Sequence, residues 1–409
     1  MTVPIMLNKL CGAVLSALFL FACSESTEID LSAEAARISR SSIIVDTHID
    51  VPFRLTIAPD DISKATESGD FDYPRAVAGA LNAPFMSIYT PAELEAAGDS
   101  KESADGLIDM IEGFVEQWPE KFALARTTSD VREQFAAGVI SLPMGMENGS
   151  PIEGDLDNLQ YFYDRGIRYI TLTHSLSNHI ADSSYDENRQ WNGLSEFGAR
   201  VVREMNRLGI MVDISHASDA AFWQVIEISE VPVIASHSSA RHFTPGFERN
   251  MDDEMIVALA ANGGVVQINF GSSFVTAEAR AYSDARSAAK KLYTVEHPEL
   301  SKLDLYRAYP AIYAEENGPL PYATLDDVLD HIDHVVSLTS IDHVGIGSDY
   351  DGVGDSLPVG LKDVSSYPNL VKGLLQRGYS EDDIRKILGE NLLRVWKKVE
   401  DYAAASARK

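Results

Sequence analysis

Histidine and carboxylate residues that could bind metal ions follow several short apolar runs of the sequence. His48 and Asp50 are two positions apart, so on a β-strand their side chains point to the same face. Imidazole and carboxylate groups side by side suit Zn²⁺ or Mn²⁺. A lone histidine at such a position is usually a hydrogen-bonded polar residue or a cap, whereas a whole set indicates one site. The set consists of His48, Asp50, Glu147, His174, His216, His237 and Asp349.

Five members of this set are candidate metal ligands: His48, Asp50, Glu147, His216 and His237. One catalytic zinc ion usually has three protein ligands and a water. Five ligands are typical of two ions, about 3.5–4 Å apart, that share a bridging carboxylate. Glu147 is the natural bridge because it has two oxygens to divide, with His48 and Asp50 on one ion and His216 and His237 on the other. A water between the ions would be largely deprotonated and could attack a carbonyl.

The scaffold expected to bring these residues together is a barrel of parallel strands. Short, β-branched apolar runs are typical of strands buried on both faces. Helical patterns lie between them, for example Ser195–Leu208, Met251–Ala261 and a helix that starts at Ser380. This alternation predicts the α/β class and a (β/α)8 TIM barrel, in which the C-terminal ends of the strands surround the active site. The strands are expected within Ser42–His48, Ala76–Tyr89, Gly138–Met146, Arg168–His174, Ile210–Ser215, Val231–Ser236, Gly264–Phe270 and His343–Ser348.

The segment 272–325 interrupts the alternation. It has little strand signal and contains four prolines, and it is longer than a plain connection between a strand and a helix. We expect a partly helical insertion near the barrel mouth. The alternative is a peripheral excursion with no role at the site.

Composition limits the class of protein. The 409 residues include 62 acidic and 34 basic side chains, a net charge of −28, which would repel nucleic-acid phosphates. The 45% hydrophobic and 23% charged residues exclude wholesale disorder. The two cysteines, Cys11 and Cys23, lie near the N-terminus, which excludes a disulfide framework or a cysteine zinc site in the body of the chain.

The N-terminal residues resemble a bacterial lipoprotein signal. The apolar run Leu10–Ala22 is too short to span a bilayer comfortably and ends just before Cys23. We therefore expect a signal peptide over 1–22, a lipid anchor on Cys23, a polar tether over 23–37 and the barrel over 38–409. The expected location is the bacterial cell envelope, facing the periplasm or on the outer membrane. The alternative is an ordinary secretory peptide cut near Ala22.

The motifs at the strand ends resemble those of the membrane dipeptidase (renal dipeptidase) family of binuclear zinc enzymes, among the amidohydrolase-like barrels. The matching stretches follow the family order over nearly the whole chain. They are Asp46–Pro52, Gly145–Asn148, Arg168–His174, Leu208–His216, Ser236–Ala240, Arg249–Asn250, Gly347–Gly352 and Gly389–Val395.

This resemblance implies zinc-dependent hydrolysis of small dipeptides, including those with a D-residue at the C-terminal position. It implies two Zn²⁺ ions, with Mn²⁺ or Co²⁺ as alternatives, bound by the same five ligands and activating a bridging hydroxide. It adds His174 as the group that stabilises the oxyanion and Arg249 as the group that binds the substrate carboxylate. It also makes Asp349 the acid and base that carries a proton to the leaving amine. The structural alternatives are a cap for His174, an ion pair with Glu248 for Arg249 and a strand-end carboxylate for Asp349.

Two positions depart from the family pattern and bear on the substrate. Phe53 stands where the animal enzymes have tryptophan, so the pocket wall should be smaller, and Gly271 should open the side-chain pocket. The same site could instead deacylate N-acyl-amino acids or open a lactam. A non-catalytic, lipid-anchored protein that binds peptides or metal is the alternative from another class of function. For the oligomeric state, a homodimer is the alternative to a monomer.

Other polar residues are given supporting or neutral roles. Asp46 is expected to support the strand that carries His48. His331 and His334 lie on an amphipathic helix with many acids, and we expect both to be solvated.

Overall fold

The computed structural model of the chain describes residues 1–2, 4 and 31–408. Contacts divide the chain into two units, Met1–Asp30 and Leu31–Lys409, and the fold lies in the second. Most of the predicted signal peptide, Cys23 and the start of the tether lie outside the described residues. Within the described part of the chain, no helix is both long and apolar enough to cross a bilayer.

Eight parallel strands form one sheet in the order β1-β2-β5-β6-β7-β8-β9-β10. A parallel bridge between Ile49 and Tyr350 links the end of β1 to the segment after β10, so the sheet nearly closes on itself. The predicted TIM barrel is therefore confirmed, and each of the eight expected runs overlaps one barrel strand. The strands are β1 Val45–Ile49, β2 Ala83–Tyr89, β5 Met144–Glu147, β6 Ile167–Thr171, β7 Met211–Asp213, β8 Ile234–Ala235, β9 Val265–Ile268 and β10 Val344–Ile346.

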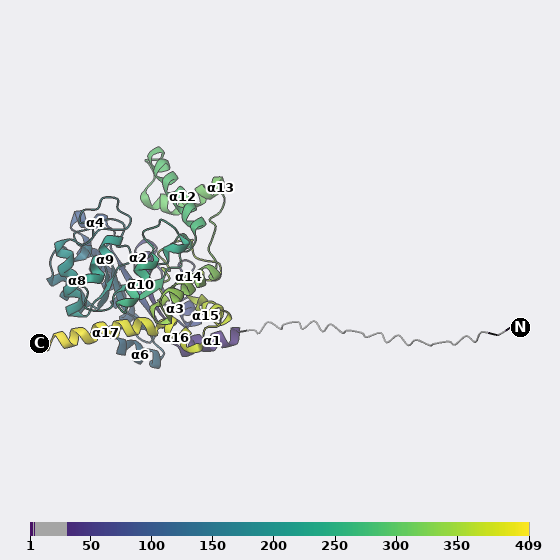
Figure 1. Cartoon of the computed structure of the whole chain (residues 1–409). Coiled ribbons are helices and arrows are strands. Elements are labelled where there is room, and N and C mark those ends of the chain that lie inside the picture. Colours follow the sequence, from purple (N-terminus) through teal and green to yellow (C-terminus); the bar gives the residue numbers. More distant parts are fainter. Residues whose placement is uncertain (3, 5–30, 409) are drawn as a thin grey trace. The chain divides into compact units, whose positions relative to one another are not determined.

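Helices connect these strands and surround the sheet (Figure 1). Helix α8 shows how the sequence sets their limits: the Ser195 hydroxyl accepts a hydrogen bond from the N–H of Gly198 at 2.8 Å, and Gly209 ends the helix at φ 91°. The helices are α1 Ser32–Ser41, α2 Val51–Ile57, α3 Tyr73–Ala78, α4 Glu93–Ala97, α5 Ser100–Gln117, α6 Thr128–Ala137, α7 Asp157–Arg165, α8 Glu196–Leu208, α9 Asp219–Ile228, α10 Asp253–Ala261, α11 Ser272–Val275, α12 Ala277–Glu296, α13 Lys302–Asn317, α14 Leu325–Leu338, α15 Tyr367–Gln376, α16 Glu381–Arg385 and α17 Asn391–Ser406.

Two of the expected strand runs are only partly strand. The beginning of Ala76–Tyr89 belongs to helix α3, because Asp72 caps its first turn by accepting from the N–H of Arg75 at 2.8 Å. The run Gly138–Met146 is divided at Pro143. Its first half is β4 (Ile140–Leu142), which pairs with β3 (Phe122–Leu124) in a separate two-stranded sheet.

The tether predicted over 23–37 is too long at its C-terminal end. From Ser32 the chain forms α1, which buries Ala35 and Ile38 and contacts α15. This helix is part of the folded unit because its apolar side has a partner.

The segment 272–325 is largely helical, as expected. It contains α11, α12 and α13, and Figure 1 shows α12 and α13 outside the ring of barrel helices.

The expectation that His331 is solvated is wrong. Its ring is fully buried, with Nδ1 accepting from the N–H of Ala240 at 3.0 Å and Nε2 donating to the carbonyl of Val275 at 2.9 Å. It lies on the face of α14 that also buries Val328 and Val335, so helical spacing places it inside. Burial lowers the pKa of His331 to about 4, so it is buried as a neutral ring.

Candidate metal centre

The five candidate ligands come from four strand ends and lie at one place. His48 is in β1, Asp50 follows that strand directly, and Glu147 is the last residue of β5. His216 and His237 follow β7 and β8 within a few residues. All five side chains are buried. The barrel thus brings together residues that are up to 189 positions apart in the chain.

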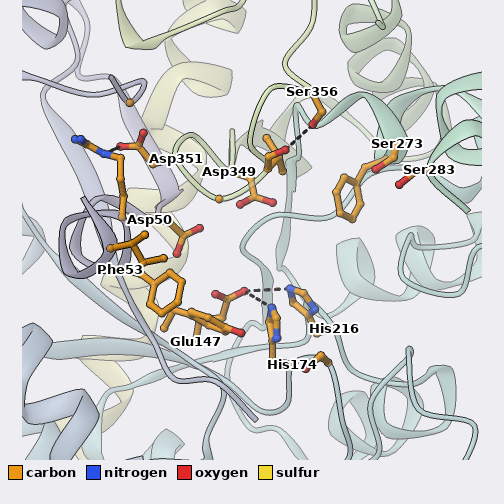
Figure 2. A pocket seen from close by; sticks show the side chains of 18 of the residues that line it. Asp50, Phe53, Glu147, His174, His216, Ser273, Ser283, Asp349, Asp351 and Ser356 are labelled. Atoms are coloured by element: carbon orange, nitrogen blue, oxygen red, sulfur yellow. Dashed lines mark hydrogen bonds and ion pairs between the residues drawn. The ribbon is translucent and has the colours of Figure 1, made fainter. Parts of the chain in front are cut away.

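The two carboxylate oxygens of Glu147 face different ligand groups. Oε1 lies 3.1 Å from Nε2 of His216 and 3.3 Å from Nε2 of His237. Oε2 lies 3.5 Å from Nε2 of His48. Figure 2 shows Glu147 beside His174 and His216, with Asp50 and Asp349 facing the same space. This division of oxygens is what a carboxylate between two cations requires.

Several polar atoms in this group are buried without a hydrogen bond to any described residue. They include Nε2 of His48 and Oδ1 of Asp50. Nε2 of His48 also lies 3.4 Å from Oδ2 of Asp50. Buried lone pairs without partners are costly, and a cation would satisfy them. The donor set of three imidazoles and two carboxylates therefore fits zinc or a similar divalent ion.

The tautomer of His48 is set by Tyr169. The Tyr169 hydroxyl donates to the carbonyl of Thr47 at 2.9 Å, so it accepts from Nδ1–H of His48, also at 2.9 Å. The lone pair of His48 is then on Nε2, the atom that faces Glu147. An outer hydrogen bond of this kind fixes the orientation of a metal-binding imidazole.

His237, whose ring stacks on that of His48 with centroids 3.8 Å apart, is oriented by an equivalent hydrogen bond. The Ser236 hydroxyl donates to Oδ2 of Asp213 at 2.6 Å and therefore accepts from Nδ1–H of His237 at 2.7 Å. The lone pair of His237 is again on Nε2. Burial lowers the pKa of His237 and of His216 well below the usual range, which favours the neutral form that binds metal.

Replacing Tyr169 by phenylalanine tests this arrangement. The variant loses the acceptor that holds His48, so we expect the protein to bind zinc about 10–100-fold more weakly, the usual cost of removing such an outer partner. Competition with a chelator of known affinity measures the change. Tyr402→Phe, on α17, is the control and should leave zinc affinity unchanged.

Asp349 and His174 complete the wall of the centre. Oδ2 of Asp349 accepts from Nδ2 of Asn269 at 2.8 Å, and burial raises the pKa of this carboxyl well above its usual range. Nε2 of His174 lies 3.6 Å from Oε1 of Glu147, and burial lowers its pKa. The backbone of Asp349 and of His216 has positive φ, 65° and 66°, a conformation that non-glycine residues adopt mainly at constrained sites.

Arg249 is buried close to the candidate ligands. Its Nη1 donates to the hydroxyl of Ser238 at 2.8 Å and its Nη2 to the carbonyl of His237 at 2.9 Å. Its Nε is buried without a partner among the described residues. Glu248 pairs with Arg189 instead, so the alternative of a surface ion pair between Glu248 and Arg249 is wrong.

A cavity of about 1190 Å³ opens onto the centre. Asp50, Glu147 and Asp349 are among the residues that line it. The insertion supplies Phe274 and Arg286 to its wall, so this segment does contribute to the site.

The two predicted specificity residues differ in their placement. Phe53 lines the cavity and packs edge-on against Tyr89, with ring centroids 4.8 Å apart. Gly271 lies behind the wall: a Cβ there would come within 2.8 Å of Val353 and 2.9 Å of Phe274, which do line the cavity. The glycine lets these two side chains pack closely and does not itself open a pocket.

Sequence reasoning missed four residues that hold the centre in place: Tyr169, Asp213, Ser236 and Asn269. Asp46, by contrast, does support its strand as expected, accepting from the N–H groups of His48 and Ser348 at 3.1 and 3.0 Å. Asp213 and Ser236 lie at strand ends that also carry a candidate ligand, and this is their only signal in the sequence. Tyr169, within β6, and Asn269, after β9, have no such signal.

Comparison with known proteins places the chain in a family. Residues 32–409 match the family model "Membrane dipeptidase (Peptidase family M19)". An uncharacterised dipeptidase of Schizosaccharomyces pombe is 32% identical over 378 residues, covering 88% of this chain and 81% of the relative. The crystal structure of the probable dipeptidase PvdM from Pseudomonas aeruginosa is similar, with a TM-score of 0.80 and 26% identity over 91% of this chain and 99% of that one.

A metallopeptidase from Rhodobacter sphaeroides, solved with a phosphinate mimic of the dipeptide L-Ala-D-Ala, has a TM-score of 0.71 and 26% identity over 88% of this chain and 99% of that one. The family model covers the whole barrel, and the likeness to these two solved structures extends over 91% and 88% of this chain. The chain therefore belongs to the membrane dipeptidase family of metallopeptidases, peptidase family M19.

Proposed function

We propose that the protein hydrolyses small dipeptides that carry a free C-terminal carboxylate, with two zinc ions held by His48, Asp50, Glu147, His216 and His237. The observation that carries this proposal is the division of the Glu147 oxygens between two ligand groups. When bound, the two ions, with Mn²⁺ or Co²⁺ as alternatives to zinc, would polarise the scissile carbonyl and lower the pKa of the attacking water.

The side chains around the centre would then handle the proton and the developing charge. Asp349 takes a proton as water attacks the carbonyl carbon, and it delivers that proton to the amine when the C–N bond breaks. Its buried position and raised pKa suit a group that must hold a proton between the two steps. His174, neutral because burial lowers its pKa, offers an N–H group to the developing oxyanion. The products are two free amino acids.

Arg249 would bind the substrate carboxylate, since it is a buried guanidinium with a free Nε. In Arg249→Lys the planar fork is lost. A hydrogen bond to a charged group is worth about 1.5–3 kcal/mol, so we expect KM for free dipeptides to rise about 10–100-fold with little change in kcat.

A dipeptide with a C-terminal carboxamide provides the matched control for Arg249→Lys. It lacks the charge that Arg249 would bind, so its KM should be the same in both proteins. An equal rise in KM for both substrates would remove this role from Arg249.

A substrate panel tests the reaction itself. Zinc-loaded protein is incubated with L,L- and L,D-dipeptides, N-acyl-amino acids and a lactam, and free amino acids are quantified. We expect both dipeptide series to be cleaved; the ligand of the Rhodobacter sphaeroides relative, a mimic of L-Ala-D-Ala, supports acceptance of a C-terminal D-residue. Cleavage of the N-acyl or lactam compounds alone would favour those reactions, and turnover of none would favour a binding protein.

We also propose that the protein is exported and anchored to the bacterial envelope through a lipid on Cys23, as the N-terminal sequence predicts. In Cys23→Ser we expect the protein to move from the membrane fraction to the soluble fraction. Fractionation and labelling with a radioactive fatty acid measure this, and Cys11→Ser is the control. Labelling of Cys23→Ser equal to that of the unmodified protein would contradict the anchor.

A further inference from the structure

A second group of potential metal ligands lies outside the cavity, where the short helix η2 (Arg241–Phe243) meets α10 and α14. It consists of His242, Asp253 and His334, whose ligand atoms all lie within 4.8 Å of one another. None of these residues lines the cavity or contacts the candidate centre. We propose that this group binds one divalent transition-metal ion, with zinc as the representative, independently of the hydrolysis proposed above.

The geometry brings three donors to one point. Nε2 of His334 lies 2.7 Å from Oδ1 of Asp253. The ring of His242 stacks on that of His334, with centroids 4.5 Å apart and an angle of 26° between planes. Zinc bonds of about 2.0–2.1 Å to imidazole and about 2.0–2.2 Å to carboxylate fit a group of this spread after small rotations of the side chains. The exposed position of His242 leaves a side open for water as a fourth ligand.

The chemistry of the group favours a cation over a simple ion pair. Two imidazoles and a carboxylate form a ligand set suited to zinc and its neighbours. Neutral imidazole is the form that binds metal. Glu254 and Asp253 begin α10 and Asp252 caps it, while Arg241, next to His242, pairs with Asp219 and Asp252. Acidic side chains therefore outnumber basic ones around the group, which favours cations.

An ion at this position would connect segments that are distant in sequence. His242 lies in the stretch between Ala240 and Met251, whose ends pair through a parallel bridge, and this stretch also carries Arg249. Asp253 belongs to α10 and His334 to α14. Binding would therefore tie the stretch 240–251 to two barrel helices and reduce its local opening.

Calorimetric titration tests the site. The purified holoenzyme, dialysed free of loosely bound metal, is titrated with Zn²⁺, and we expect one additional saturable equivalent in the unmodified protein. His242→Ala and His334→Ala should each lose this equivalent. His297→Ala removes another exposed histidine, one beside Glu299, and should keep it. His242 is the safer variant for folding because its contacts are ring contacts at the surface.

Hydrogen exchange provides a second readout that does not depend on activity. Zn²⁺ should slow exchange in residues 240–251 of the unmodified protein and leave it unchanged in His242→Ala. No additional equivalent in the unmodified protein, or the same equivalent in both histidine variants, would overturn the proposal. Dipeptide hydrolysis by His242→Ala should equal that of the unmodified protein. A negative result for this second metal site would therefore not count against the proposed hydrolysis.

Discussion

Replacing Glu147 by glutamine should abolish hydrolysis and reduce the zinc content of the protein. An amide keeps one oxygen and replaces the other with an NH₂ group that cannot bind a cation. One of the two ions would therefore lose its carboxylate ligand from position 147. We expect kcat/KM to fall at least about 10⁴-fold, which corresponds to roughly 5.5 kcal/mol of transition-state stabilisation. Metal analysis and steady-state kinetics on the same preparation measure both effects.

A matched control exists in another glutamate that contacts a histidine. Glu95 lies 2.7 Å from Nδ1 of His179, away from the cavity. Glu95→Gln should keep full zinc content and activity, and thermal melting should show that both variants fold. Full activity in Glu147→Gln would show that hydrolysis does not require Glu147 to bridge two metal ions.

Replacing Asp349 by asparagine should stop turnover while the metals stay bound. The asparagine is nearly isosteric with Asp349 but cannot take up or deliver a proton. General acid–base groups contribute about 10²–10⁴-fold to rate, so we expect kcat to fall about 10³-fold. The measurements are kcat, zinc content and the affinity for a phosphinate dipeptide mimic, and the last two should change little.

The control for Asp349→Asn lies a few residues further along the same segment. The side chain of Asp355 is 84% exposed and lies 3.9 Å from the ammonium of Lys362. Asp355→Asn should therefore leave kcat and zinc content unchanged. Loss of zinc in Asp349→Asn would mean that Asp349 acts as a ligand. Unchanged kcat would mean that another group carries the proton.

The barrel could be predicted because its strands are short apolar runs buried on both faces, and such runs are visible in sequence. The prediction failed where local signals compete with hydrophobicity. Asp72 caps a helix at the start of one expected strand, and Pro143 divides another. His331 was expected outside because its helix carries many acids, yet its spacing from Val328 places it on the buried face.

The candidate ligands could be predicted because all of them are at the ends of strands that point to the same rim. The residues that orient them could not, since those contacts depend on tertiary structure. Tyr169 reaches His48 across 121 positions of sequence, and Asn269 reaches Asp349 across 80. A tyrosine or asparagine in an apolar run carries no local sign of such a partner.

The most direct test of the two-metal account is zinc titration of the metal-free protein, with hydrolysis of L-Ala-D-Ala followed at each addition. Using His242→Ala for this experiment removes binding at the surface group. Activity should be absent without metal, reach its maximum after two equivalents of zinc and disappear again with a chelator. Full hydrolysis by the metal-free protein, or a maximum at one equivalent, would contradict the account.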